Sequence, residues 1–481
     1  MGSSLFGTLN NSLQAIQAFQ EALSVAQNNV SNSSTPGYAR QVANLEALPF
    51  DPANGSSGGV VAGPTTSTNN EYVNQAVRNQ LSNQGNYTAQ SSALSSIESL
   101  FDVSGQTGIV SALNNLFQSF SAWSATPGAA SAQQQVLTSA QSLAQSFQST
   151  AASLSQTTTQ VNQNISSTVQ QINQLAAQIQ SDNIAIQRNP NPSSGVDPGV
   201  SANLEASLES LSQLANITVN FASDGTATVL LGGQTALVVG AQENSIQANF
   251  STTTGSVNPG GVPNVVIQDA NGQDITASIS GGSLGGLLTV RNTVLPSLQG
   301  NGTQTGALNQ LAQQVADRVN QVLTSATTPS GQAGVPLFTY NNASPVDVAS
   351  TLALSSTITA SSLASVDPTQ PTVGNGAALT LSNLGTSTNP ADQIGGQTIL
   401  QFLSNVAAQV GQQASNAQTG QTAATQAVTQ AQAVQTQISG VSLDAEAINV
   451  MELQQGYQAA GKMVSVVNSL AQTLMSMVGS G

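Results

Sequence analysis

The C-terminal stretch that decides the fold reads VMELQQGYQAAGKMVSVVNSLAQTLMSMV and runs from Val450 to Val478. Its apolar residues recur in alternating steps of three and four, which is the spacing of a coiled-coil seam. Glutamine, serine, asparagine and glycine flank this seam. We therefore predict a C-terminal axial coiled-coil helix over residues 438–481, and a helix packed within its own domain is the alternative. The seam consists of Val450, Leu453, Tyr457, Ala460, Val464, Val467, Ala471, Leu474 and Val478.

The beginning of the chain carries a second heptad pattern between Leu5 and Val30. Its first set of seam positions is Leu9, Ile16, Leu23 and Val30. Its second set is Leu5, Ser12, Phe19 and Ala26, with the serine as its weak point. Because the two chain ends have the same character, the simplest fold pairs an N-terminal axial helix region, residues 1–50, with residues 438–481.

Between the ends, the sequence pattern changes from helical to strand-like and back to helical. Residues 51–195 and 284–437 carry long helical patterns, and we predict that they form two parts of one helical bundle domain, with a mixed insertion at about 331–384. Short β-branched runs alternate with turns over residues 196–283, where Ser223-Asp224-Gly225 is a hairpin signal. The predicted fold is therefore α+β and multidomain. Both chain ends form a long-helix coiled coil or bundle, and a β-rich outer domain is inserted in the middle.

Charged residues make up only 6% of the 481 residues, and the net charge is −15 with six basic residues. So few cations argue against nucleic acid and against anionic membrane surfaces as partners. No stretch approaches the roughly 18 apolar residues that a transmembrane helix needs, so we expect no membrane insertion. The first residues lack the basic and continuous apolar parts of a secretory signal, and we expect no cleavable signal peptide.

The chain contains no histidine and no cysteine, which removes most of the usual catalytic and metal-binding chemistry. Neither a Cys/His zinc site nor a Ser-His-Asp or Cys-His nucleophile can be built. A Ser-Lys pair is possible only around Lys462. The glycine-rich run at 281–288 lacks the Lys-Ser/Thr that follows in a phosphate loop. We therefore expect no enzyme activity, no catalytic or metal site, and no cofactor.

Two motifs at the chain ends resemble the signatures of the flagellar axial proteins, a family of rod, hook and hook-associated proteins. The first lies at 28–41 and predicts a helix end followed by a Pro-Gly turn. The second lies at 439–444, where Ser442 is suited to cap the next helix. The matching residues are Asn28, Asn29, Asn32, Gly37, Tyr38, Arg40 and Gln41 in the first motif, and Gly440, Leu443 and Asp444 in the second.

Further motifs in the middle of the chain resemble the hook-associated branch of that family. They are the run 281–288 with Arg291 behind it, Leu308-Asn309-Gln310-Leu311-Ala312, and Gly334-Val335-Pro336-Leu337-Phe338. The resemblance spans nearly the whole chain. It departs at Ala445, which stands where the family has an acid.

This resemblance implies a structural subunit of the bacterial flagellum at the hook–filament junction. It implies export by the flagellar type III system and an extracellular location. The implied partners are further copies in a ring of about eleven subunits, the hook protein, hook-associated protein 3, and a cytosolic export chaperone on the C-terminal region. Another axial protein, a hook or distal rod subunit, is an alternative. A secreted adhesin on a helical stalk is an alternative from a different class.

Overall fold

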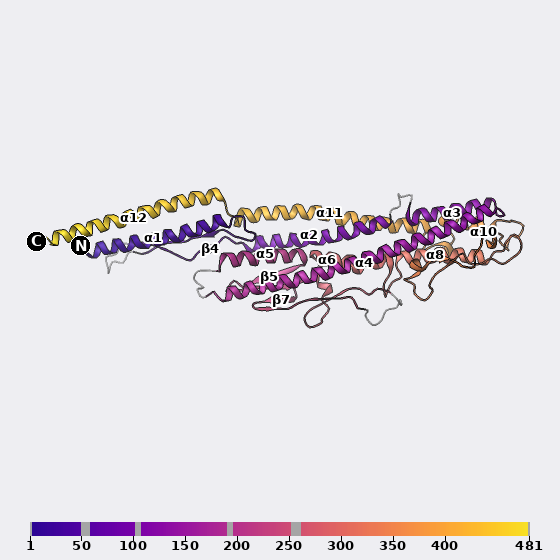
Figure 1. Ribbon diagram of the computed structural model, residues 1–481, viewed down its shortest axis with the longest axis horizontal. Coiled ribbons are helices and arrows are strands. Elements are labelled where there is room, and N and C mark those ends of the chain that lie inside the picture. The colour runs from indigo at the N-terminus through magenta and orange to yellow at the C-terminus, as the bar shows by residue number, and fades with distance from the viewer. Residues whose placement is uncertain (1, 50–57, 102–106, 190–195, 252–260, 480–481) are drawn as a thin grey trace. The chain divides into compact units, whose positions relative to one another are not determined.

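The computed structural model describes residues 2–49, 58–101, 107–189, 196–251 and 261–479 (Figure 1). Long helices form both chain ends and much of the middle, with short strands between them, so the fold class expected from the sequence is confirmed. The helices are α1 (Gly2–Ser31), α2 (Glu71–Glu98), α3 (Gly108–Ala125), α4 (Ala130–Gln187), α5 (Pro198–Leu214), α6 (Gly282–Thr289), α7 (Leu295–Gln299), α8 (Ala307–Thr324), α9 (Val348–Thr351), α10 (Gly376–Ser382), α11 (Ile399–Ser439) and α12 (Leu443–Gly479).

The strands are short and fall into separate small antiparallel sheets within the described residues. The largest sheet has the order β5-β6-β7-β8. The strands are β1 (Gln41–Val42), β2 (Leu45–Ala47), β3 (Val60–Ala62), β4 (Thr66–Ser67), β5 (Ile217–Phe221), β6 (Ala227–Leu231), β7 (Thr235–Val239), β8 (Gln242–Glu243), β9 (Gln247–Asn249), β10 (Val266–Gln268), β11 (Phe338–Thr339) and β12 (Ala353–Leu354).

The chain divides into two compact units. Unit 1 comprises residues 1–81, 172–245 and 425–481, and unit 2 comprises residues 82–171 and 246–424. The range 196–283, expected as one β-rich domain, is divided between them. It also begins with a helix, α5, because Asp197 caps a run of leucines at helical spacing and accepts hydrogen bonds from the amides of Gly199 and Val200.

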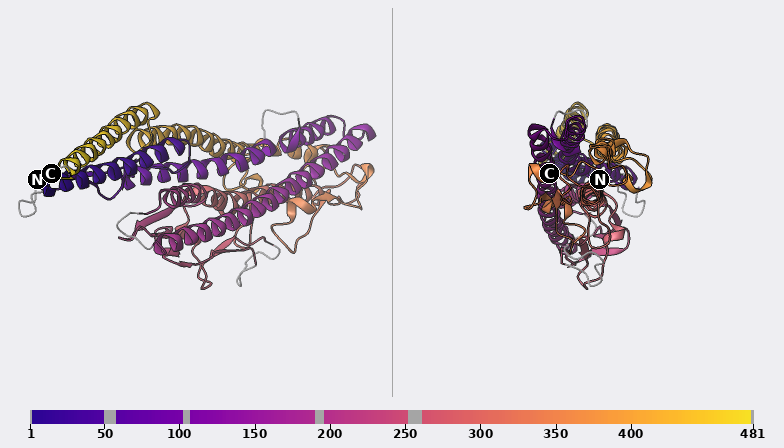
Figure 2. Two further views of the ribbon diagram at one scale, coloured as in Figure 1. Left: turned by 60° about the vertical axis from the view of Figure 1, so that its left-hand side comes forward. Right: turned by 90° about the vertical axis from the view of Figure 1, so that its right-hand side faces the viewer.

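Within unit 1, α1 and α12 lie side by side and run in opposite directions, as Figures 1 and 2 show. The most buried apolar residues of α1 are small: Ala18, Ala22 and Ala26 are each at most 3% exposed, and α1 is covered by β3 as well as by α12. The ring of Phe19 lies on Gly456 of α12, where an added Cβ would come within 2.8 Å of the ring.

The four-stranded sheet of unit 1 is held to the end of α4 by a buried asparagine. Asn183 is fully buried, and its amide donates to the carbonyls of Ala227 (2.8 Å) and Gly240 (2.9 Å). Its Oδ1 accepts from the backbone N–H of Ala227 (2.8 Å). The hairpin between β5 and β6 turns at Gly225, whose φ of 88° is in the left-handed region. The Asp-Gly hairpin signal at this position therefore coincides with an observed turn.

In unit 2, the glycine-rich run at 281–288 forms α6 and packs closely against α2. A Cβ on Gly286 would lie 2.3 Å from the carbonyl oxygen of Asn86, so the glycines of this run allow close helix packing.

The helix then passes through a π-helical turn, Val290–Val294, that contains the buried Arg291. Arg291 donates to Asn162 Oδ1 (2.7 Å) and to the carbonyl of Pro263 (2.8 Å).

Candidate functional site

The N-terminal and C-terminal motifs meet in unit 1, at a place that we call the joint. The joint consists of the end of α1, the segment 33–42, Thr68, and the connection between α11 and α12. It is the one place among the described residues where both motifs contribute to the same hydrogen-bond network. We therefore build the candidate site from its side chains.

Asn29 is the centre of the joint on the α1 side and is only 1% exposed. Its amide donates to the carbonyl of Gln41 (2.8 Å), and its Oδ1 accepts from the Gln41 N–H (2.9 Å) and from the Tyr38 hydroxyl (3.0 Å). One side chain thus folds the following segment back onto the helix end. Burial raises the pKa of Tyr38, and the negative charge of Glu446 adds to this rise.

Gly37 allows the Pro-Gly turn to rest directly on α5. Its φ is 74°, in the left-handed region that glycine adopts without steric penalty. A Cβ at this position would lie 2.3 Å from the carbonyl oxygen of Ala202 and 3.0 Å from the amide nitrogen of Ala206. The turn therefore requires glycine for two independent reasons, its conformation and its contact with the α5 backbone.

Arg40 ties the two motifs together. Its backbone N–H donates to the carbonyl of Ser439 at the end of α11 (2.8 Å), and its carbonyl accepts from the N–H of Thr68 (2.9 Å). The Ser439 hydroxyl donates to the Thr68 carbonyl (3.0 Å). The Arg40 guanidinium also forms an ion pair of 2.5 Å with Glu446, which is completely buried in the first turns of α12. Arg40 therefore bonds both to the end of α11 and to the first turns of α12.

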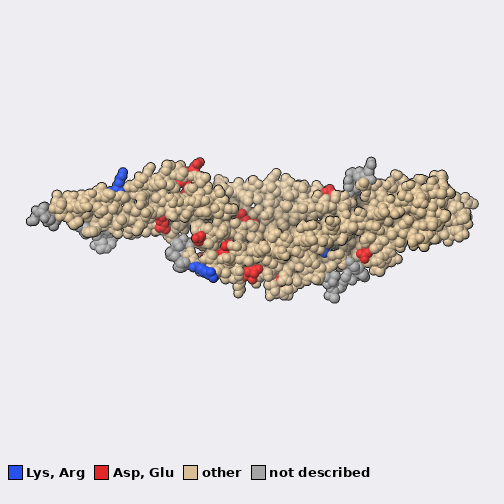
Figure 3. Space-filling model, viewed as in Figure 1, with Lys and Arg blue, Asp and Glu red and all other residues tan. Residues whose placement is uncertain are grey.

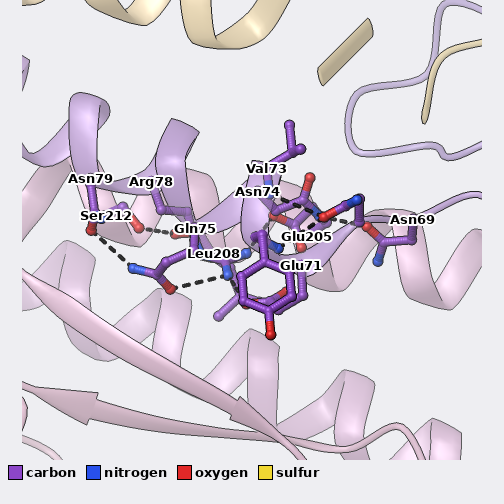
Figure 4. Close-up of polar contacts among 12 residues, drawn as sticks. Asn69, Glu71, Val73, Asn74, Gln75, Arg78, Asn79, Glu205, Leu208 and Ser212 are labelled. Atoms are coloured by element: carbon purple, nitrogen blue, oxygen red, sulfur yellow. Dashed lines mark hydrogen bonds and ion pairs between the residues drawn. The ribbon is translucent and has the colours of Figure 1, made fainter. Parts of the chain in front are cut away.

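A cluster of charged residues lies beside the joint, and we call it the acid cluster. It consists of Glu71 and Arg78 on α2 and of Glu205 and Glu209 on α5. Figure 4 shows three of its members, Glu71, Arg78 and Glu205. Arg78, at 1% exposure, pairs with Glu205 at 2.7 Å and also with Glu71. The pKa of Glu205 is raised to about 7, chiefly by burial. The positive charge of Arg78 acts to lower this pKa, and the carboxylates of Glu209 and Glu71 act to raise it further.

A polar cavity of about 380 Å³ lies between the joint and the acid cluster. Glu205 and Glu209 form one wall, and Gln435 of α11 forms another. The amide of Gln435 donates to Asn74 Oδ1 (3.0 Å) and to Glu209 (2.8 Å). The end of α11 is therefore connected to α2 and α5 through one uncharged side chain.

The structure brings only part of the two motifs into the joint. Asn29, Gly37, Tyr38, Arg40 and Gln41 take part directly. Asn32 closes the end of α1 locally, because its amide donates to the carbonyl of Asn28 (3.0 Å). The C-terminal motif contributes through the carbonyl and the hydroxyl of Ser439. The N–H of Gly440 bonds to Thr436 within the end of α11, and the side chains of Leu443 and Asp444 are exposed. Ser442 accepts from the N–H of Ala445 (3.4 Å), as a helix cap does.

The expected seams lie differently on the two helices. On α12, most seam residues are the less exposed ones, with Ala460 at 9% and Val467 at 6% exposed, although Leu474 is 41% exposed. The side chain of Val478 lies outside the described residues. On α1, Leu9, Ile16 and Leu23 are half-buried, and Val30 is 40% exposed. The most buried positions are the alanines, whose small side chains give a weak periodic signal in the sequence.

Thr68 and the acid cluster are parts of the site that the sequence did not indicate. Thr68 belongs to no motif. It bonds to Ser439, which lies 371 positions further along the chain, and no local pattern indicates such a contact. Glu205 lies in a helix whose apolar spacing makes it look like an ordinary surface acid. No group of three His, Cys, Asp or Glu residues in the described part of the chain is placed to hold a metal ion.

Charged side chains are few and scattered over the surface shown in Figure 3. Lys462 is exposed on α12. None of the described helices combines the length and apolarity that a membrane crossing requires.

Two family models match the chain. The flagellar hook-associated protein FlgK helical domain matches residues 94–338, which is about half of the chain. The flagellar basal body rod FlgEFG protein C-terminal model matches residues 430–477, which include the end of α11 and most of α12. The second match covers the C-terminal side of the joint.

Curated proteins and a solved structure are similar over larger spans. Flagellar hook-associated protein 1 of Bacillus subtilis (strain 168) is 24% identical over 100% of this chain and 99% of its own length. Flagellar hook-associated protein 1 of Escherichia coli (strain K12) is 23% identical over 69% of this chain and 59% of its own length. The solved structure of the flagellar hook junction protein FlgK from Burkholderia pseudomallei aligns with a TM-score of 0.62 at 17% identity, over 76% of this chain and 100% of that chain.

Proposed function

The chain belongs to the flagellar hook-associated protein 1 family, whose members are structural proteins of the bacterial flagellum, and on this premise we propose how it acts there. It occupies the hook–filament junction as a closed ring of about eleven subunits. The hook protein lies on one side of this ring and hook-associated protein 3 on the other. It is a mechanical adaptor without catalytic activity.

The observation that carries this proposal is the uncovered apolar face of α12. Within the described residues, α12 packs along α1, and the rest of its surface leaves large apolar side chains in solvent. They are Ile448, Met451, Met463, Val466 and Leu470, all between 50% and 55% exposed. An apolar stripe of this kind is typical of a protein–protein contact.

The same stripe accounts for two successive partners. Before export it is covered by a cytosolic chaperone, because an exposed apolar helix face promotes aggregation. After export through the type III system it packs against neighbouring subunits outside the cell. Either partner covers the stripe, so the two cannot bind it together.

The hook and distal rod subunits are less well supported as alternatives. The match at 430–477 is to a rod-type C-terminal model and fits any axial protein. The match at 94–338 is to the helical domain of the hook-associated protein and spans residues that the C-terminal match does not reach. The middle of the chain therefore favours the junction.

A deletion strain tests this proposal. We expect cells that lack the chain to retain intact hooks in electron micrographs and to release unpolymerised flagellin into the medium, measured by immunoblot. Complementation with the full chain should restore filaments. Loss of the hooks themselves would indicate a hook or rod subunit, and normal filaments without the chain would refute the junction role.

A further inference from the structure

The acid cluster gathers three carboxylates and one guanidinium beside the joint. Arg78 contacts Glu205 and Glu71, and Glu209 lies one helical turn from Glu205 on α5. Glu205 is 4% exposed, so water cannot screen it well. When all four groups are ionised, the cluster holds an excess of negative charge around the buried Glu205, which disfavours the closed packing of α5 on α2.

Within the described residues, the other elements that surround Glu205 bring no further positive charge to it. On the segment 33–42, Tyr38 lines the cavity and the guanidinium of Arg40 is paired with Glu446. The end of α11 contributes the uncharged Gln432 and Gln435. A second cavity of about 220 Å³ on the side of α4 and the β5–β6 turn is lined, apart from Glu205, by uncharged residues such as Ile186 and Phe221. Arg78 is thus the single cation among the described residues in direct contact with Glu205.

Movement of α5 reaches the joint by two contacts. The turn at Gly37 rests on the α5 backbone at Ala202 and Ala206. The amide of Gln435, near the end of α11, bonds to Glu209 of α5. A displacement of α5 from α2 therefore loosens both the segment that carries Arg40 and the end of α11 to which Arg40 is bonded.

We propose that Glu205 is a proton-operated latch of the joint: its protonated form keeps α5 packed on α2 and the joint closed, and its ionised form loosens both. The proposal concerns the chain by itself and does not depend on the junction role. It predicts that the connection between α11 and α12 is more rigid in mildly acidic than in alkaline medium.

The direction of the pH dependence follows from the raised pKa of Glu205. Its pKa is about 7 in the closed joint and 4.5 ordinarily, so the closed joint binds the proton more tightly than the open one. The closed joint is therefore favoured fully below about pH 4.5 and loses this advantage as the pH rises through about 7. Glu71, whose pKa burial also raises, acts in the same direction.

Hydrogen exchange of the full chain tests the latch. The backbone N–H groups of Arg40 and Thr68 are bonded across the joint, to Ser439 and to Arg40 respectively. After correction for the intrinsic pH dependence of exchange, we expect their opening to be about tenfold more frequent at pH 8 than at pH 6. The amide of Val315 in unit 2 serves as the internal reference and should not change.

Two variants and a control decide the outcome. Glu205→Gln keeps an acceptor for Arg78 but cannot ionise, so the tenfold change should disappear. Glu209→Gln removes one repelling charge and should make the change smaller. Glu98→Gln, on an exposed residue of α2 in unit 2, should leave it as in the unmodified chain. The latch is overturned if the unmodified chain shows no pH response. It is also overturned if the response survives unaltered in Glu205→Gln. Should Glu205→Gln not fold, an unaltered response in Glu209→Gln would overturn it instead.

Discussion

Glycine is required at position 37 but not at position 461. Gly37 has a left-handed φ of 74° and no room for a Cβ beside Ala202. Gly461 lies within α12, and a Cβ there would meet no atom within 4 Å beyond the neighbouring backbone of its own helix. We expect Gly37→Ala to destabilise unit 1 by about 1–3 kcal/mol, the usual cost of a strained backbone position. Gly461→Ala should stabilise α12 by about 0.5–1 kcal/mol.

Calorimetric melting of the two glycine variants checks this pair. The Tm should fall for Gly37→Ala and rise slightly for Gly461→Ala. If both variants melt at the temperature of the unmodified chain, the turn at Gly37 does not rest on α5 as described.

Arg40 illustrates how far a single residue can be predicted. Its place after Gly-Tyr in the N-terminal motif was visible in the sequence, and so was its rarity as one of six basic residues. Its partner was not, because Glu446 lies 406 positions away in the chain. Glu446 is also one of two acids in the first turn of α12, and the other, Asp444, is exposed. Only the packing of the joint selects between them.

At the scale of the element, α12 presents two apolar faces with different tasks. The inward face, represented by Leu453 and Val467, covers α1. We expect the double change Leu453→Ala with Val467→Ala to destabilise the α1–α12 pair. Truncating a fully buried leucine to alanine costs roughly 2–5 kcal/mol. Leu453 is only half-buried, so its truncation should cost less than that. Thermal melting of the monomer by circular dichroism should show the loss, and motility on soft agar should fall with it.

The outward face of α12 should behave differently. Met463→Gln with Val466→Gln replaces two side chains that are 51% and 54% exposed. The monomer should keep its stability within about 0.5 kcal/mol, as surface changes usually do, while motility and chaperone affinity measured by calorimetry both fall. Gln454→Ala with Asn468→Ala, on exposed polar flank positions, is the matched control and should affect none of these. Equal damage from the control pair would contradict the assignment of faces.

At the scale of the whole molecule, the few basic residues make trypsin a probe of local opening. Lys462 and Arg188 are exposed, whereas Arg78 and Arg291 are each 1% exposed. Because a single pair of helices buries little apolar surface, the α1–α12 pair should open far more often than the rest of the chain unfolds. We expect early cleavage after Lys462 and Arg188 and late cleavage after Arg78 and Arg291, followed by mass spectrometry. Resistance of Lys462 equal to that of Arg291 would show that the pair is as stable as the cores.

The sequence by itself determined the local features of this protein. Helical periodicity over α12 and the turn at Asp224-Gly225 depend on residues a few positions apart, so their side chains and backbone preferences suffice to indicate them. The long terminal helices, the strands between them and the membership of a flagellar family were accessible in this way. The lack of histidine and cysteine likewise argues against most catalytic chemistry, because the side chains that such chemistry needs do not occur in the chain.

Only the tertiary structure decided which surfaces meet. It covered part of the apolar surface of α12 and left the rest in solvent, it buried Ala18, Ala22 and Ala26 of α1 most deeply, and it buried Glu205 beside Arg78. These outcomes depend on contacts between residues far apart in the chain. The free energy of burial and desolvation is set by the neighbours that packing supplies, and a carboxylate in the sequence has no such neighbours until the chain has folded.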